Sequence, residues 1–425
     1  MDNLINSPLS ATPSQLSLLD LNDYCFLDIF AYLNVNDLIL ASTLCKRLEY
    51  NAHRLFPHRL RLWKDICDDV KTADFLLSKV GRFITEIEID GDGEPGITIQ
   101  ETMELLQRNC KYLEKVVLHH TVPSDLLLLP TSLTHISIKF PENWTPTEGF
   151  MEKLKSFNNL ESLTLIFKQF TEIESDFLTE LPPLKQLRLK NCSVEPMHLQ
   201  TCLANSKTDL ESLTIRKCFQ EFPDILIESV DRLVKLNELE CQFNCAPANF
   251  SPFSLFNRLT SLKLTNASAS IDVDKLFGAL ISHNKIQTLS MCSIDIDNGL
   301  PLNIKTVKQL HRLTNLRRLN LYETDFVNDE FLLEITKGKS LTHLRYKQTY
   351  LPMLSLEAVL DCIALNGPKL QKVSYIVYHD ASRVTQNSDQ KKELLNTFRK
   401  TETFKRVTHC KENISNKLTS VEFSF

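Results

Sequence analysis

A glycine-rich acidic segment is the first place where this sequence could do chemistry. Gly91-Asp92-Gly93-Glu94-Pro95-Gly96 matches the G-x-G-x-x-G pattern of dinucleotide-binding loops. Its carboxylates would face a pyrophosphate, and the strand expected before it is half polar, so the match is poor. With Asp90 and Glu101, the same carboxylates occupy positions 1, 3, 5 and 12 of a calcium loop, but Pro95 stands where that loop needs glycine. We therefore expect an acidic solvent-exposed loop.

Two further motifs are incomplete. Gly338-Lys339-Ser340 ends like a phosphate-binding Walker loop, but Leu333 occupies the position of the first glycine. Cys241 and Cys245 lie four residues apart, but Cys241 falls at an apolar position and no nearby pair of histidines completes a zinc set. No Ser/His/Asp or Cys/His spacing indicates a nucleophile. The sequence therefore predicts a protein that is not an enzyme, with no catalytic residue, no bound metal and no cofactor.

Basic and aromatic side chains form a stronger candidate site. They alternate with apolar residues in a recurring L-x-x-L-x-L phrase, of which 184–189 is the clearest copy. Alternate side chains of a strand share a face, so Leu187 and Leu189 are expected to be buried while the residues between and beside them are displayed. The displayed residues that we predict to bind a substrate are Arg188, Arg216, Arg318, Tyr322, His343, Arg345, Lys347 and Lys372.

The last six of these residues, from Arg318 to Lys372, belong to three consecutive phrases. Neighbouring strands lie about 5 Å apart, so these side chains should form one contiguous cluster. Such a cluster could bind an acidic or phosphorylated peptide through charge-assisted hydrogen bonds. The alternative is a charged face that is merely solvated.

The phrase recurs along most of the chain and determines the expected fold. Successive copies begin at Ile84, Leu113, Leu133, Leu160, Leu184, Leu210, Leu236, Leu259, Ile286, Leu316, Leu341 and Leu370, with a late copy at Leu418. The mean step of about 26 residues resembles the period of leucine-rich repeats. We therefore predict an α/β solenoid, in which a curved parallel sheet is covered on one face by return helices and displays its other, concave face.

Three short helices are expected before the repeats. From Asp23 onward, Phe26, Ile29, Phe30 and Leu33 form one stripe of an amphipathic helix. Asn34, with Asp37 three residues later, is typical of a capped start of a second helix, and residues 48–55 suggest a third. A module of this size seldom completes its own core, so part of the stripe should contact another surface.

This helical segment resembles an F-box over about residues 18–57. The resemblance depends on Leu21-Asn22-Asp23, on 29–33 with the sequence IFAYL, on Asn36-Asp37-Leu38 and on Cys45-Lys46-Arg47. The segment departs from the family pattern at Asn22, Tyr24 and Leu48. An F-box ahead of leucine-rich repeats is similar to the substrate receptors of Skp/cullin/F-box ubiquitin ligases.

That resemblance implies a division of labour. The helical module would dock a Skp-family adaptor, which links it indirectly to a cullin, and the repeats would hold a protein substrate for ubiquitination by other subunits. The implied adaptor contacts are Leu21, Phe26, Ile29, Phe30, Leu33 and Leu38. The alternative is a ligase-independent repeat scaffold or inhibitor-like binding protein, whose N-terminal helices only cap the solenoid.

Composition completes the expectations. We predict a flexible tail at 1–17, the F-box module at 18–57, a helical linker or N-terminal cap at 58–82, the solenoid at 83–380, and a C-terminal cap and tail at 381–425. The formal net charge of −5 gives no bulk attraction to nucleic acid or to an anionic membrane. No leader or long apolar run is evident, and most of the 12 cysteines lie in helical or repeat patterns, so we expect reduced thiols and an intracellular protein, cytoplasmic and/or nuclear.

Overall fold

The computed structural model describes two compact parts of the chain. The described residues are 18–56, 58–62, 70–90, 99–120, 128–142, 148–206, 209–217, 222–229, 233–243, 256–266, 272–294, 303–349, 354–366, 369–378, 388–414 and 418–425. The first unit comprises Met1–Leu118 with Leu128–Pro130, and the second comprises His119–Leu127 with Thr131–Phe425. The predicted glycine-rich loop at 91–96, Cys245 and the tail at 1–17 lie outside the described residues.

The first unit begins with the expected helices. Its elements are η1 (Leu18–Asp20), α1 (Asp23–Phe30), α2 (Val35–Leu44), α3 (Lys46–His53), β1 (Arg59–Leu62), α4 (Val70–Val80), η2 (Gly81–Phe83), β2 (Glu86–Asp90), α5 (Ile99–Asn109) and β3 (Lys115–His119). Asn22 caps α1 by accepting a hydrogen bond from the amide of Cys25. The predicted cap of α2 is confirmed, because the side chain of Asn34 accepts a hydrogen bond from the amide of Asp37 at 2.9 Å.

Strand β1 corrects part of the prediction of a helical linker or N-terminal cap at 58–82. Within that range α4 (Val70–Val80) is a helix, but β1 is a strand. Residues 59–62 pair instead with β2 in parallel, with Leu60 opposite Ile87 and Arg61 opposite Glu88. Leu60 and Ile87 are both buried. The basic and apolar residues of β1 alternate with period two, which is the pattern of a half-buried strand rather than of a helix.

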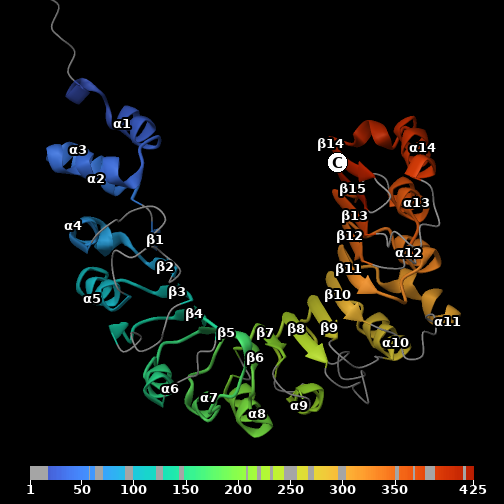
Figure 1. Cartoon of the computed structure of the whole chain (residues 1–425), viewed down its shortest axis with the longest axis horizontal. Coiled ribbons are helices and arrows are strands. Elements are labelled where there is room, and N and C mark those ends of the chain that lie inside the picture. Colours follow the sequence, from blue (N-terminus) through green and yellow to red (C-terminus); the bar gives the residue numbers. More distant parts are fainter. Residues whose placement is uncertain are drawn as a thin grey trace, which may run out of the picture. The chain divides into compact units, whose positions relative to one another are not determined.

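The second unit continues the alternation of strands and helices. Its elements up to β13 are β4 (His135–Lys139), α6 (Glu148–Lys155), β5 (Ser162–Thr171), α7 (Phe177–Glu180), β6 (Gln186–Cys192), α8 (Pro196–Asn205), β7 (Ser212–Arg216), α9 (Phe222–Ser229), β8 (Glu238–Phe243), β9 (Ser261–Asn266), α10 (Val273–His283), β10 (Thr288–Ile294), α11 (Ile304–Val307), η6 (Leu310–Arg312), β11 (Arg318–Thr324), α12 (Asp329–Thr336), β12 (His343–Gln348), α13 (Leu356–Asn366) and β13 (Lys372–Tyr378). Strands β4 to β13 follow one another in the sheet in chain order. Figure 1 shows the helices of this unit along one face of the sheet, which leaves the other face without helices.

The predicted repeat is confirmed at the level of strands. Each phrase from Ile84 to Leu370 contains a strand that begins two residues after the first residue of the phrase. The inward side chains stack in register, as when Leu319, Leu344 and Val373 occupy one row across β11, β12 and β13, and all three are buried. This architecture is consistent with a repeat solenoid, in which each unit gains its core from its neighbours.

A recurrent backbone turn ends many of these strands. His120, Asn191, Lys217, Ser293 and Glu323 all have positive φ, between 48° and 59°. Each is the eighth residue of its phrase. Left-handed backbone is unusual for residues other than glycine, so its return at one position indicates that the repeats share a backbone path as well as a core.

The C-terminal end departs from the repeat. Its elements are α14 (Ser388–Arg399), η8 (Phe404–Arg406), β14 (His409–Ile414) and β15 (Leu418–Ser424). The phrase at Leu418 does form a strand, but β15 runs antiparallel between β13 and β14 and so does not extend the parallel stack. Only three residues separate β14 from β15, which is too few for the crossover that parallel neighbours require. Within the described part of the chain, no helix is both long and apolar enough to cross a bilayer.

Candidate functional site

The N-terminal helices have a core of their own, which contains several of the predicted adaptor contacts. Phe26, Phe30 and Leu38 are buried among α1–α3, and Leu21 and Leu33 are half-buried. Ile29, at 42% exposure, is the predicted contact most open to a partner. The buried members of this set therefore stabilise the module and present little surface to another protein.

Arg47 holds this module together from one side. Its guanidinium donates to the Asp23 carboxylate at 3.0 Å and to the carbonyl oxygens of Leu19 and Leu21 at 2.6 and 2.7 Å, and it lies over the ring of Phe26. These hydrogen bonds from Arg47, and then one from Asn51, hold the pKa of Asp23 below its ordinary value. Arg47 of the Cys45-Lys46-Arg47 triplet thus has a structural role within the helices.

A second set of apolar side chains is exposed on η1, on α1–α3 and in the turn after α1. Tyr32 is 91% exposed and Leu44 is 73% exposed, and the other members of the set are Leu18, Leu19, Tyr24, Ile29, Leu40 and Tyr50. Leu40 and Leu44 are four residues apart on α2 and so lie on one face of that helix. Apart from Ile29, this set was not predicted from the sequence, because the amphipathic pattern identifies the inward stripe. The spacing of Leu40 and Leu44 is a local signal that could have indicated an exposed apolar face.

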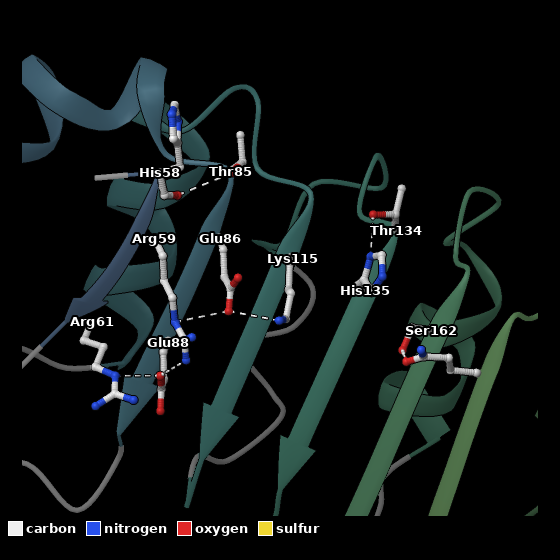
Figure 2. Close-up of polar contacts among 11 residues, drawn as sticks. His58, Arg59, Arg61, Thr85, Glu86, Glu88, Lys115, Thr134, His135 and Ser162 are labelled. Atoms are coloured by element: carbon white, nitrogen blue, oxygen red, sulfur yellow. Dashed lines mark hydrogen bonds and ion pairs between the residues drawn. The ribbon is translucent and has the colours of Figure 1, made fainter. Parts of the chain in front are cut away.

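In the first unit the helix-free face carries charges of alternating sign. Figure 2 shows Glu86 between Arg59 and Lys115, at 3.2 and 3.0 Å, and Glu88 bound by Arg59 and Arg61 at 2.7 and 2.8 Å. The hydrogen bond from Arg59 to Glu88, together with the charge of Glu86, raises the pKa of the Arg59 guanidinium. Each carboxylate here is matched by cations on the neighbouring strands, so this ladder is satisfied from within the chain.

The predicted residues Arg188 and Arg216 belong to a partly neutralised group on β6–β9. Glu240 of β8 is only 12% exposed and lies 3.1 Å from Arg216, 3.2 Å from Lys263 and 3.7 Å from Lys190. Burial acts to raise the pKa of Glu240, but the surrounding cations outweigh burial and hold that pKa below its ordinary value. Arg216 is therefore engaged within the chain, whereas Arg188 is exposed on the same face.

The remaining predicted residues do come together on β11–β13. Arg318, His343 and Lys372 occupy one register row across these strands, and Tyr322 is opposite Lys347 four residues further along. We call Arg318, His343, Arg345, Lys347 and Lys372 the β11–β13 basic cluster. None of its members has a carboxylate within ion-pair distance among the described residues. In the β1–β3 ladder and in the Glu240 group, by contrast, cations pair with carboxylates of the chain.

Aromatic rings shape the same cluster. The Arg345 guanidinium lies 5.6 Å from the ring centroid of Tyr322, and the Lys347 ammonium lies 5.7 Å from that of Tyr378. Such cation–π contacts hold long side chains in place without cancelling their charge. Tyr378 was not among the predicted site residues, although its place two residues beyond Ile376 on β13 puts it on the displayed face.

Reactive side chains are scarce in the described part of the chain. Burial raises the pKa of the Cys362 thiol to about 11 and that of Cys110 to about 12, so both are protonated at neutral pH. Cys241 is fully buried in the core. Lys339 adopts a left-handed turn, and the hydroxyl of Ser340 donates to the carbonyl of Leu316 at 2.8 Å. Among the residues described, no group of three or more His, Cys, Asp or Glu side chains is placed to hold a metal ion.

Fold and surfaces together define a class. This chain is a large α/β protein. In its described part, 15 strands, mostly parallel to their neighbours, alternate with helices and follow the N-terminal helices α1–α3 in the sequence. Beyond that class, no protein-family model matches the chain. A comparison with curated proteins gives no match either.

Proposed function

We propose that this protein is a non-catalytic substrate receptor of a Skp/cullin/F-box-type ubiquitin ligase. In this proposal α1–α3 dock a Skp-family adaptor, and the helix-free face of the second unit holds a protein substrate. The proposal combines the F-box-like sequence of residues 18–57 with the repeat that follows it. It requires no catalytic residue in this chain, because transfer of ubiquitin would be performed by other subunits.

The observation that carries the proposal is the exposed apolar set on α1–α3. These helices already have a filled core, and yet they leave large side chains such as Tyr32, Leu40 and Leu44 in water. Fully burying one such side chain contributes about 1.5–3 kcal/mol, and apolar groups gathered on a surface commonly mark a protein interface. An adaptor that covers this set would therefore gain substantial binding free energy.

The burial of Phe26, Phe30 and Leu38 supports a second candidate function, that of a ligase-independent scaffold protein. If the F-box-like stripe serves only the fold of the module, the helices could cap the solenoid of a scaffold protein that never meets a ligase. The two functions differ in one respect, which is whether the outer surface of α1–α3 binds an adaptor.

The first prediction therefore changes the outer surface and spares the core. A chain with Leu40→Glu and Leu44→Glu should lose co-purification with a Skp-family adaptor and cullin, because two charges would have to be buried at the interface. The measurement is a pull-down with purified adaptor, together with circular dichroism to show that the helices remain. The matched control is Leu365→Glu, since Leu365 is a similarly exposed leucine on α13.

The result has a clear reading in either direction. Loss of adaptor with Leu40→Glu/Leu44→Glu and retention with Leu365→Glu supports the ligase receptor. If the unaltered chain fails to bind a Skp-family adaptor, or if the double variant binds it equally well, the receptor proposal fails and the scaffold function takes its place.

A further inference from the structure

The row of residues formed by Arg318, His343 and Lys372 is an unusual arrangement for a sheet. Register partners on adjacent strands lie about 5 Å apart, and like charges directly opposite each other are destabilising. The chain avoids this cost in the first unit, where Glu86 separates Arg59 from Lys115. On β11–β13 the middle position is taken by a histidine, which can be neutral.

The hydrogen bonds around His343 define which ring nitrogen is available. The hydroxyl of Thr342 donates its single proton to the carbonyl of Arg317 at 2.9 Å. The same hydroxyl oxygen lies 2.9 Å from Nδ1 of His343, so Nδ1–H must be the donor of that second bond. In the neutral ring Nε2 then carries a lone pair, and it has no partner among the described residues.

The charged groups that face His343 all favour its neutral form. Arg318 faces it from β11 and Lys372 from β13, while Arg345 is two residues along β12 on the same face. Burial, and then the charges of Arg318 and Lys372, lower the pKa of His343 below its ordinary value. An anion placed over this row would instead favour the protonated form of His343, because it would neutralise both cations and accept a hydrogen bond from a protonated Nε2.

We infer that the β11–β13 basic cluster binds a phosphate monoester carried on a protein segment, and that one proton is taken up between His343 Nε2 and the phosphate. The inference rests on the proposed function, because it names the chemistry of the substrate that the receptor would hold. Arg318 and Lys372 supply the charge on either side, and Arg345 stands in the next register row. A phosphate has three strong acceptor oxygens, which match three donors better than a carboxylate with two oxygens does.

The surroundings of the cluster favour a local phosphate over a long polyanion. The row from Arg318 to Lys372 spans only two strand spacings, or about 10 Å. Glu422 of β15 lies in the register row of Arg345, beyond Ser374, whose hydroxyl donates to it at 3.2 Å. Toward β8 the same face carries Glu238. A nucleic acid following this face would meet carboxylates on both sides of the cluster, whereas a phosphorylated peptide would not need to extend that far.

Histidine NMR on the full chain tests the inference. The probes are three peptides, Gly-Gly-phosphoserine-Gly-Gly, the same peptide with serine, and the same peptide with glutamate. The phosphopeptide should raise the pKa of His343, and it should bind more tightly as the pH falls from 8 to 6.5. Below about pH 6 protonation of the phosphate itself opposes this gain. Arg318→Gln or Lys372→Gln should weaken binding about tenfold, which corresponds to loss of one charge-assisted hydrogen bond.

The chain offers a matched control for the histidine. Thr134 and His135 repeat the Thr–His arrangement on β4, with the hydroxyl oxygen 2.8 Å from Nδ1, as Figure 2 shows. The register partner of His135 on β5 is Ser162, which is not a cation. His343→Gln should abolish the dependence of phosphopeptide binding on pH between 8 and 6.5, and His135→Gln should leave it unchanged. Lys308→Gln, an exposed lysine next to α11, controls for the loss of one positive charge.

Several outcomes would overturn the inference. These are equal binding of the serine and phosphoserine peptides, equal binding of the glutamate peptide, an unchanged pKa of His343, or tighter binding of a ten-residue oligothymidine to the same side chains. None of them depends on adaptor binding, so failure here is separable from failure of the receptor proposal. Conversely, a native chain that binds the phosphopeptide and fails to bind a Skp-family adaptor would support the β11–β13 basic cluster as a phosphate site and reject the ligase role.

Discussion

At the scale of a single residue, Glu240 compensates the charge of three neighbouring cations in the second unit. Arg216, Lys263 and Lys190 all converge on its carboxylate, which is largely buried. Removing that charge would leave three cations facing one another in a poorly solvated place. Glu240 therefore stabilises the fold rather than opposing a ligand, which is a different role from that of the uncompensated charges on β11–β13.

A prediction follows for Glu240→Gln. The substitution should lower the free energy of unfolding by about 1–3 kcal/mol at neutral pH, because a buried charge-assisted network loses the anion on which its described cations converge. Urea unfolding of both chains in low and high salt measures this difference in the free energy of unfolding. High salt should reduce the difference. Lys263→Gln removes one of the surrounding cations and should cost less. An unchanged midpoint for Glu240→Gln would show that the group contributes nothing to stability.

The pH dependence of this effect has a definite sign. The surrounding cations hold the pKa of Glu240 in the folded protein below its ordinary value. The folded state therefore binds fewer protons than the unfolded state, so the stabilisation is present above the unfolded pKa and is lost as the pH falls through the folded pKa. The stability difference between the native chain and Glu240→Gln should accordingly shrink as the solution is acidified.

At the scale of elements, the left-handed turn at the end of the strands is the feature most open to test. Lys217 follows β7, has φ of 52° and is exposed. A residue with a side chain is disfavoured in this conformation by roughly 1–2 kcal/mol relative to glycine. Replacing Lys217 by glycine would relieve this strain, but part of the stabilisation is offset because glycine is more flexible in the unfolded chain.

We therefore expect Lys217→Gly to raise the stability of the protein by a few tenths to about 1 kcal/mol, and Lys217→Val to lower it, since a β-branched residue fits this region worst. Thermal unfolding of the two variants beside the native chain gives the comparison. Lys308→Gly, in ordinary right-handed backbone, should instead be destabilising. Stabilisation by both glycine variants would argue against strain at the turn.

At the scale of the whole molecule, the proposed functions belong to different units. The exposed apolar set lies on α1–α3 of the first unit, and the β11–β13 basic cluster lies in the second. Each repeat contacts only its neighbours, so changes at one end should not be felt structurally at the other. The two binding activities should therefore be separable by substitution.

Charge reversal in the second unit provides that test. Arg345→Glu with Lys347→Glu should abolish capture of substrate from cells in which degradation is blocked, while binding to a Skp-family adaptor continues. Both side chains lie beside aromatic rings on the displayed face and do not contribute to the core, so the fold should be retained. The reverse pattern is expected for Leu40→Glu/Leu44→Glu. Retained capture by the charge-reversed chain would exclude the cluster as the substrate site.

The sequence by itself determined where most strands lie and which of their side chains point inward. Twofold alternation and the recurrence of the leucine phrase are local properties of the chain, so Leu187, Leu189 and their counterparts were placed correctly. The N-terminal helices were predicted for the same reason, since caps such as Asn34 act within one turn. The gathering of Arg318, His343 and Lys372 in one row also followed, because equal phrases give equal register.

Only the tertiary structure decided which of the displayed charges are already satisfied. Arg188, Arg216 and Arg345 occupy similar positions in the sequence pattern. Arg216 forms an ion pair with Glu240 from a later repeat, whereas Arg345 lies over the ring of Tyr322. The structure also showed that Phe26 and Phe30 are buried while Tyr32 is not, and that β15 runs against its neighbours. The physical reason is that pairing, burial and strand direction depend on contacts between residues far apart in the chain, which a local pattern does not specify.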